Sequence, residues 1–315
     1  MSLQERFRAI REEISKVIYG QDEVIDFSLA SLFSSGHMLL EGPPGVAKTL
    51  LVRTIAAALD LSFRRVQMTP DLLPGDITGS TVYRAHSETF EFRPGPVFAN
   101  FLLADEVNRA SARTQSALLE AMQELGVTHD GTTHSLPDPF IVFATQNPIE
   151  QEGTYPLPLA QLDRFMFKVM VSYPSQEAEQ RVLREHHASA GQSNPVAMQV
   201  RPVVTTQDIL EARQTIRDTH VRDEVIRYVS DLLRATRNDD TLTVGASPRS
   251  GLMLLMGAKS LAQFSGRDFV IPDDIKAAFL PVMRHRVVLA PSTELEGVTP
   301  DEVLASLLET VEVPR

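Results

Sequence analysis

Residues 39–51, LLEGPPGVAKTLL, have the side chains and the spacing that a triphosphate-binding turn needs. They nearly match the pattern G-x-x-x-x-G-K-[ST]. Gly42 and Gly45 permit a tight turn whose backbone N–H groups point at phosphate oxygens, at the positive end of the following helix. Lys48 would place its charge on the β- and γ-phosphates, and Thr49 would bind Mg²⁺ through its hydroxyl. The stretch therefore predicts a strand, a phosphate loop and the start of a helix.

The phosphate loop departs from the pattern at one position, where Ala47 precedes the lysine in place of glycine. Because this position lies at the helix start, where helical φ and ψ suit alanine, we expect the extra methyl group to be tolerated. The alternative is a glycine-rich connection that binds nothing. The predicted nucleotide-binding residues of the loop are Gly42, Pro43, Pro44, Gly45, Val46, Ala47, Lys48, Thr49 and Leu50.

A pair of acids follows the apolar run FANFLLADE. A phosphate loop that binds Mg²⁺ needs a carboxylate at the end of a neighbouring buried strand. Asp105 fits that role in the outer coordination sphere of the metal, and Glu106 fits as the carboxylate that polarises an attacking water. Either acid alone could be a solvated strand end, but the two motifs in this order favour a nucleotide site.

Three further residues have the chemistry that phosphoryl transfer requires. Asn147, at the end of FIVFATQNP, could hold the attacking water through its amide, or could simply start an Asn-Pro turn. Arg164 in LAQLDRF and Arg249 in GASPRSG could each stabilise the developing phosphoryl charge, because a guanidinium is planar and permanently charged. Each arginine could equally be an ordinary solvated side chain.

The composition is that of a globular protein with enough apolar residues for a core, at 315 residues, 43% hydrophobic and 23% charged. A net charge of −11 argues against a nucleic-acid partner bound by phosphate neutralisation. The absence of cysteine excludes disulfides and thiolate metal sites. The N-terminal residues lack the apolar stretch of a signal peptide, and no run approaches the roughly 18 apolar residues of a membrane span, so we expect a cytoplasmic protein.

The elements that must position these residues are those of a three-layer α/β domain. Between residues 36 and 170, apolar strand candidates alternate with helical stretches. Their continuous apolar character indicates strands buried on both faces, as in a parallel sheet. The strand candidates are HMLLEG, FRRVQM, FANFLLADE, PFIVFATQN and RFMFKVMV.

Two segments interrupt this alternation and predict inserted β-hairpins. Residues 80–95 and 125–136 each alternate polar and apolar residues about a turn. The second segment contains Asp130-Gly131, a strong hairpin signal.

After Pro174 we expect helices and no further strands. Thr205 with Asp208, and Thr299 with Glu302, have the spacing of capping boxes. Ser247 before a proline is a helix N-cap signal. The predicted organisation is an α/β domain over residues 1–173 and an all-helical domain over residues 174–315.

Taken in order along the chain, these motifs resemble the MoxR family of AAA+ ATPases over nearly all of residues 15–290. The most specific matches are GPPGVAKT, TPDLLPGDITG, DEVNRASARTQSALLEAMQE, ATQNPIEQEGTYPLPLAQLDRF and GASPRSG. The family loop commonly carries alanine before the lysine, so the resemblance implies a working site. VMRHRVVL, at residues 282–289, varies the usual family ending and casts little doubt on that site.

The resemblance assigns further roles. ATP would bind between the α/β domain and the helical lid, with Gly20 and Gln21 against the adenine. Asp105 and Glu106 match the Walker B acids and Asn147 matches sensor one. The hairpins match the helix-two insert and the hairpin before sensor one.

The two arginines also receive roles from the resemblance. Arg164 matches the arginine finger, which acts on ATP held by a neighbouring subunit. Arg249 matches sensor two on the lid, where it would report the γ-phosphate and turn hydrolysis into a change of angle between the domains.

The resemblance also implies assembly and partners. AAA+ proteins form homo-oligomeric rings, usually hexamers, and MoxR proteins are thought to act as chaperones on partners with von Willebrand factor A domains, sometimes in metal insertion. We therefore expect a Mg²⁺-dependent ATPase that remodels or activates partner proteins. One alternative is a nucleotide-gated adaptor whose turnover is incidental. Another is the ATPase subunit of a magnesium or cobalt chelatase, although TPDLLPGDITG fits MoxR better.

Overall fold

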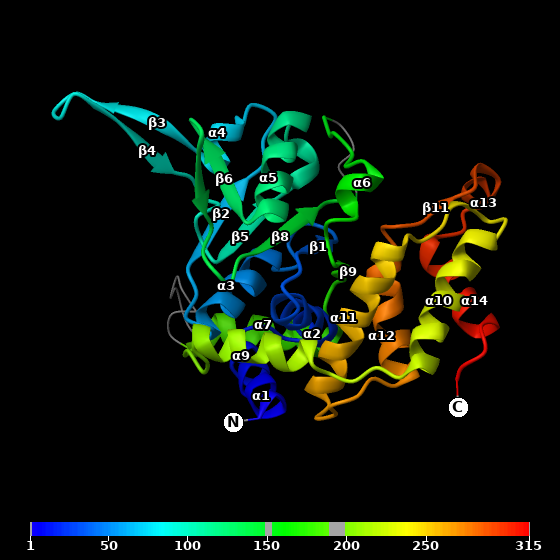
Figure 1. Cartoon of the computed structure of the whole chain (residues 1–315). Coiled ribbons are helices and arrows are strands. Elements are labelled where there is room, and N and C mark those ends of the chain that lie inside the picture. The colour runs from blue at the N-terminus through cyan, green and yellow to red at the C-terminus, as the bar shows by residue number, and fades with distance from the viewer. Residues whose placement is uncertain (1, 149–152, 189–198, 315) are drawn as a thin grey trace.

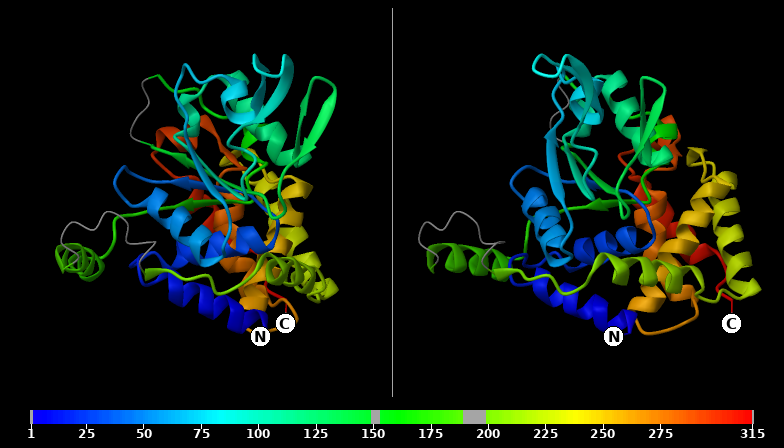
Figure 2. Two further views of the ribbon diagram at one scale, coloured as in Figure 1. Left: turned by 90° about the vertical axis from the view of Figure 1, so that its left-hand side faces the viewer. Right: turned by 60° about the vertical axis from the view of Figure 1, so that its left-hand side comes forward.

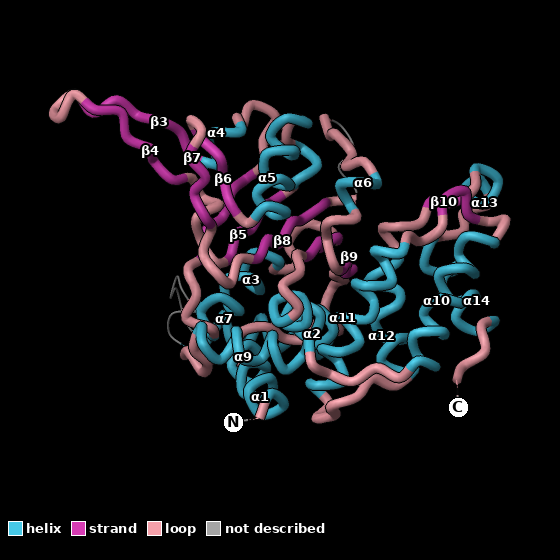
Figure 3. Tube along the Cα trace, in the orientation of Figure 1, coloured by secondary structure: helices cyan, strands magenta, loops and turns pink. Residues whose placement is uncertain are grey.

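A computed structural model describes residues 2–148, 153–188 and 199–314. Its centre is a five-stranded parallel sheet in the order β2-β5-β8-β1-β9 (Figure 1). Figure 3 shows the strands in magenta among the helices in cyan. The sheet strands are β1 (Met38–Glu41), β2 (Phe63–Gln67), β5 (Phe101–Asp105), β8 (Ile141–Gln146) and β9 (Phe167–Met170). The predicted α/β class and all five predicted strands are confirmed.

The three central strands are apolar up to the polar residues at their carboxyl ends because alternate residues enter two different cores. In β1, Met38 and Leu40 join one hydrophobic cluster, whereas Leu39 joins the other. The same alternation holds in β5, where Leu103 faces the first cluster and Leu102 the second. Burial on both faces therefore accounts for the continuous apolar runs.

Helices cover both faces of this sheet. The helices of the first face are α1 (Leu3–Ile14), α2 (Asp22–Phe33) and α3 (Lys48–Ala58). The elements on the other side are α4 (Pro74–Thr78), the short 3-10 helix η1 (Val107–Arg109) and α5 (Ala112–Glu124), followed along the chain by α6 (Leu159–Leu162). The phosphate loop joins β1 directly to α3, as predicted.

Both predicted hairpins are present. One is β3 (Gly79–Arg84) with β4 (Thr89–Pro94), and the other is β6 (Gly126–His129) with β7 (Thr132–Ser135). Asp130 and Gly131 form the turn of the second hairpin with positive φ values of 47° and 76°, as the Asp-Gly signal predicts. The β3–β4 hairpin projects away from the body of the molecule (Figure 1).

The chain after β9 is mostly helical. Helix α7 (Gln176–Ala188) stands away from the body in both views of Figure 2, and α9 (Thr206–Arg217) packs on α2. The C-terminal bundle consists of α10 (Asp223–Asn238), α11 (Pro248–Phe264), α12 (Pro272–Met283), α13 (Pro291–Leu295) and α14 (Pro300–Thr310). The expected N-caps at Thr205, Ser247 and Thr299 are confirmed, each accepting a hydrogen bond from a backbone N–H of its helix.

The expectation that strands end at Pro174 is wrong in one detail. Strands β10 (Leu242–Val244) and β11 (Val288–Leu289) pair antiparallel within the C-terminal bundle. They have three and two residues, too short for any periodicity to show, so only the packing of the bundle brings them together.

The C-terminal bundle shares one hydrophobic cluster with the α/β part of the chain. It lies beside the β9 edge of the sheet (Figure 1), where α12 contacts β9 and α11 contacts α2. A Cβ added at Gly257 of α11 would lie 2.9 Å from the Phe167 ring of β9, so glycine allows this close approach. The predicted boundary at residues 173 and 174 stays a prediction.

No helix within the described ranges combines the length and the apolar character that a membrane crossing requires.

Candidate functional site

The phosphate loop turns through two residues with positive φ. Gly45 has φ 83°, which glycine adopts without cost. Ala47 has φ 61° and ψ 24° as the N-cap of α3, so the expectation of helical φ and ψ at this position is wrong. An alanine in the left-handed region costs about 1–2 kcal/mol, and the loop therefore stores backbone strain beside Lys48.

Hydrogen bonds fasten the phosphate loop to the carboxyl edge of the sheet. The Gly42 N–H donates to the Gln146 carbonyl at 3.3 Å. Lys48 Nζ donates to the Gly42 carbonyl at 2.7 Å and to the Gln146 carbonyl at 3.5 Å. Burial lowers the pKa of Lys48. A Cβ at Gly42 would lie 2.2 Å from the Val171 carbonyl oxygen, so only glycine allows the loop to pass this close to the end of β9.

The segment of Gly20 and Gln21 lies at the same edge. Gly20 has φ 68°, and a Cβ there would lie 2.9 Å from the Cβ of Ala178 in α7. Gln21 Nε2 donates to the Ser172 carbonyl at 2.9 Å. The residues expected to face the adenine thus contact the chain that follows β9. The phosphate loop contacts the same stretch of chain at Val171.

The acidic pair reaches this edge at the end of β5. The Thr145 hydroxyl of β8 donates to Asp105 Oδ1 at 2.6 Å and accepts the Glu106 N–H at 2.8 Å. Glu106 has φ 57°, a second non-glycine residue in the left-handed region. Asn147 directly follows β8 and is buried, with 7% of its surface exposed. Parallel pairing of β5, β8 and β1 therefore brings the acids, the amide and the phosphate loop to one end of the sheet.

Three side chains that sequence reasoning missed contact the acids. Arg65 Nε and Nη2 donate to Asp105 Oδ2 at 3.0 and 2.7 Å. Gln67 Nε2 donates to Glu106 Oε2 at 2.7 Å, and Arg109 Nη1 donates to the same oxygen at 3.2 Å. A signal for the first two exists in FRRVQM, because its polar residues at alternate positions must face one side of an edge strand.

Arg164 and Arg249 lie at the opposite end of the sheet. Arg164 precedes β9, whose first residue Phe167 pairs with Met38, the first residue of β1. A strand of four residues spans about 13 Å, so the sheet separates Arg164 from the phosphate loop of its own chain. Both arginines line a cavity of about 350 Å³ between the amino edge of the sheet and α11.

Asp163 connects Arg249 to the core. Its Oδ2 lies 3.8 Å from Arg249 Nε, and its Oδ1 accepts Arg286 Nε at 2.7 Å. Arg286 is buried and also donates to the carbonyls of Phe165 and Met166. The structure therefore places Arg249 on the same cavity as Arg164, and the role of Arg249 as sensor two stays a prediction.

The oxygen donors at the carboxyl edge fit Mg²⁺. Thr49 lies in the first turn of α3, and Asp105 is buried at the end of β5. Among the described residues no group of three or more histidine or acidic side chains could hold a metal ion by itself. Mg²⁺ characteristically binds one or two protein oxygens together with phosphates, so one hydroxyl and one carboxylate beside a phosphate loop suit it.

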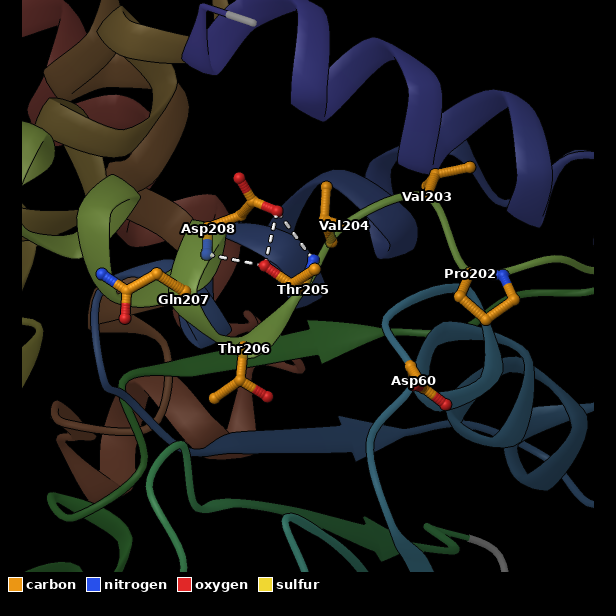
Figure 4. A pocket seen from close by; sticks show the side chains of 8 residues that line it. All are labelled: Asp60, Pro202, Val203, Val204, Thr205, Thr206, Gln207 and Asp208. Carbon is orange, nitrogen blue, oxygen red and sulfur yellow. Dashed lines mark hydrogen bonds between the residues drawn. The ribbon is translucent and has the colours of Figure 1, made fainter.

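A hollow of about 520 Å³ lies elsewhere, at the start of α9. Figure 4 shows that Thr205 and Asp208 bond to each other there, as the helix cap requires. Their polar atoms are already engaged, so this hollow adds no chemistry to the site.

Comparisons with known proteins agree with this geometry. The sequence profile of the ATPase family associated with various cellular activities (AAA) matches residues 37–167. The profile of the AAA lid domain matches residues 234–307.

Relatives match the chain over nearly its full length. The Chaperone MoxR1 of Mycobacterium tuberculosis is 45% identical over 96% of this chain and 81% of its own length. Protein MoxR of Paracoccus denitrificans is 31% identical over 98% of this chain and 96% of its own. The crystal structure of a putative ATPase from Cytophaga hutchinsonii has a TM-score of 0.91 at 42% identity, covering 99% of this chain and 96% of that one.

Proposed function

Because the chain belongs to the MoxR family of AAA+ ATPases, we propose that it binds Mg²⁺ and ATP at the carboxyl edge of the sheet and hydrolyses the ATP. The observation that carries the proposal is the meeting of three elements there: the phosphate loop, the acids after β5 and Asn147 after β8. Hydrogen bonds from Lys48 and Gly42 to Gln146 tie the loop to β8, the strand that Asn147 directly follows.

Each residue has a distinct task in this proposal. Lys48 would leave the Gly42 carbonyl to bind phosphate oxygens, which suits a cation already partly desolvated. Thr49 and Asp105 would hold Mg²⁺, which supplies charge neutralisation at the phosphates. Glu106 would accept a proton from the attacking water, and Asn147 would orient that water.

The two arginines act on a neighbouring copy in this proposal. A guanidinium stabilises the charge that develops on the transferred phosphoryl group, and Arg164 and Arg249 lie at the edge remote from their own phosphate loop. If that edge contacts the nucleotide of the next copy, both guanidinium groups reach the same nucleotide. We therefore propose a homo-oligomeric ring, of six subunits as in most AAA+ proteins.

The cellular role proposed is chaperone-like, in the remodelling or activation of a partner protein. It rests on family membership, including a relative named as a chaperone. A partner with a von Willebrand factor A domain, and a part in metal insertion, remain proposals from the same family resemblance. The cytoplasmic location remains a prediction.

The substitution Glu106→Gln tests the catalytic assignment. It keeps the size of the side chain but removes the proton acceptor, so we expect unchanged ATP affinity and a turnover at least about 100-fold lower. Steady-state phosphate release and equilibrium binding of a labelled ATP analogue measure the two quantities. Glu120→Gln, at an exposed position of α5, is the matched control and should behave as the parent does.

Unchanged turnover in Glu106→Gln would remove this carboxylate from the mechanism. A parent protein that binds ATP and releases no phosphate, with or without a partner, would favour the nucleotide-gated adaptor instead.

A further inference from the structure

The carboxylate assigned to the metal already has a cationic partner. Arg65 lies on the edge strand β2, and two of its nitrogens contact the same oxygen of Asp105, at 3.0 and 2.7 Å. Its Nη2 also donates to Gln67 Oε1 at 2.8 Å, which holds the guanidinium in place. Two donors on one carboxylate oxygen form a charge-assisted contact stronger than a neutral hydrogen bond.

Arg65 approaches Asp105 from the side of the sheet that faces the phosphate loop. In the parallel register Arg65 pairs with Leu103, and Gln67 pairs with Asp105. Leu103 packs in the same hydrophobic cluster as Leu51 and Val52 of α3. Side chains at matched positions of paired strands share a face, so Arg65, Gln67 and Asp105 all lie on the face that α3 covers.

The oxygens of Asp105 are both engaged. Oδ2 accepts Arg65, and Oδ1 accepts the Thr145 hydroxyl at 2.6 Å. The Asp105 side chain is only 13% exposed, whereas that of Arg65 is 47% exposed. The guanidinium can therefore swing toward solvent, but the carboxylate cannot. A divalent cation and a guanidinium on one carboxylate repel each other, and an arginine does not relieve this by losing its proton.

We propose that Arg65 competes with Mg²⁺ for Asp105, and that this competition sets the Mg²⁺ concentration that nucleotide binding requires. The inference rests on the proposed function, since it takes Asp105 as the metal-supporting carboxylate. Arg65 acts through Asp105 and touches neither nucleotide nor water in the reaction. It is a positioning residue that keeps the carboxylate neutralised and in place until the metal arrives.

The test is a Mg²⁺ titration of nucleotide binding. The fluorescence of a mant-labelled, non-hydrolysable ATP analogue is followed as Mg²⁺ is added to the full-length parent, Arg65→Gln and Arg65→Lys. We expect half-saturation at about tenfold less Mg²⁺ for Arg65→Gln, the size expected for loss of a charge-assisted contact. Arg65→Lys keeps a point charge without the paired contact, and should fall between Arg65→Gln and the parent.

Arg64→Gln is the matched control, because Arg64 is the exposed neighbour on the same strand and its alternation places it on the other face. It should titrate as the parent does. A folded Arg65→Gln protein that needs as much Mg²⁺ as the parent, or more, overturns the inference. Should Arg65→Gln fail to fold, an unchanged midpoint in Arg65→Lys overturns it equally.

A second measurement separates this inference from a purely structural role and from failure of the proposed function. At saturating Mg²⁺ we expect Arg65→Gln to turn over ATP within about twofold of the parent, because only the metal requirement changes. A large loss of turnover at saturating Mg²⁺ contradicts the competition. If the parent binds no mant nucleotide at any Mg²⁺ concentration, the proposed function itself fails.

Discussion

Ala47 adopts a backbone conformation that alanine rarely takes, at the residue before the phosphate-binding lysine. Its φ of 61° places the methyl group where it crowds the following carbonyl. Glu106 has the same kind of conformation at the other half of the site. Non-glycine residues in the left-handed region persist only where the surrounding structure holds them. Ala47 and Glu106 both lie in the site where the proposed chemistry needs side chains directed at the same nucleotide.

The first residue-scale prediction concerns Ala47→Gly. Replacing alanine by glycine inside a helix lowers stability by about 0.5–1 kcal/mol through chain entropy. At this position glycine also relieves a strain of about 1–2 kcal/mol, so we expect stability equal to the parent or up to about 1 kcal/mol higher. Urea unfolding followed by circular dichroism measures the change.

Ala112→Gly provides the comparison for this substitution. Ala112 is exposed in the first turn of α5, so glycine there relieves no strain and should cost the ordinary amount. Equal losses in the two variants would show that Ala47 is not strained.

At the scale of elements, His37 fastens the start of β1 to its neighbours. The Val142 N–H of β8 donates to His37 Nδ1 at 3.0 Å, and Nε2 donates to the Met122 carbonyl of α5 at 3.1 Å. This pattern requires the neutral ring, and burial lowers the pKa of His37 to about 4. An imidazole thus joins two strands and a helix at the end of the sheet remote from the phosphate loop.

The pH dependence of stability tests whether the neutral His37 ring stabilises the fold through these two hydrogen bonds. Since the folded pKa is below the ordinary value of 6.5, the unfolded chain binds more protons between pH 4 and 6.5, and stability falls as the pH drops through that window. We expect His37 to contribute a loss of about 2 kcal/mol between pH 7 and pH 5. The measurement compares denaturant unfolding of the parent and His37→Gln at both pH values.

Asp26 changes stability in the opposite direction, because burial raises its pKa to about 6. It is present in both proteins, so its effect cancels in the difference between parent and variant. The difference in unfolding free energy between the parent and His37→Gln should be about 2 kcal/mol smaller at pH 5 than at pH 7. An equal difference at both pH values would contradict the lowered pKa of His37.

The sheet and the two hairpins were predictable because their signals are local. Five apolar runs, a glycine-rich turn and an Asp-Gly turn each specify their own element. Parallel pairing then brings strand ends together at one edge, which is why the sequence alone predicts that Lys48, Asp105 and Asn147 lie close together.

What the sequence could not predict depends on packing between distant segments. The place of Arg249 follows from how α11 docks against the β9 edge and from the contact of Asp163 with Arg286. The partners of the acids depend on β2 lying next to β5, an order that no local pattern specifies. Ala47 was misjudged because φ at a helix N-cap depends on how the loop closes.

At the scale of the whole molecule, subunit mixing tests the assembly. Lys48→Ala should abolish nucleotide binding, and Arg164→Ala should spare binding but abolish turnover. Mixed in equal amounts before assembly, the two should recover roughly a quarter of the parent ATPase activity, the share of interfaces that pair an intact loop with an intact arginine edge. No recovery at any mixing ratio would contradict an arginine supplied by a neighbour.

A second mixture tests where Arg249 acts. If Arg164 and Arg249 both serve the next subunit, a mixture of Arg164→Ala with Arg249→Ala contains no intact arginine edge and should stay inactive. If Arg249 instead served its own chain, the same mixture should recover activity to the extent of the first. Steady-state phosphate release distinguishes the two outcomes, and the mixture of Lys48→Ala with Arg164→Ala is the positive control. The mixture of Lys48→Ala with Arg249→Ala should recover activity only if Arg249 acts on the next subunit.

The length of the sheet strands separates the phosphate loop from the two arginines. The two ends of each protomer therefore carry different halves of a complete site. An interface in which the arginines of one copy meet the phosphate loop of the next, always in the same direction, is heterologous. In an open row of copies that all face the same way, the nucleotide of the copy at one end has no neighbouring arginines. The arginines of the copy at the other end contact no nucleotide. Closing the row into a circle joins those two ends, so a closed assembly has one more competent interface than an open array of the same length.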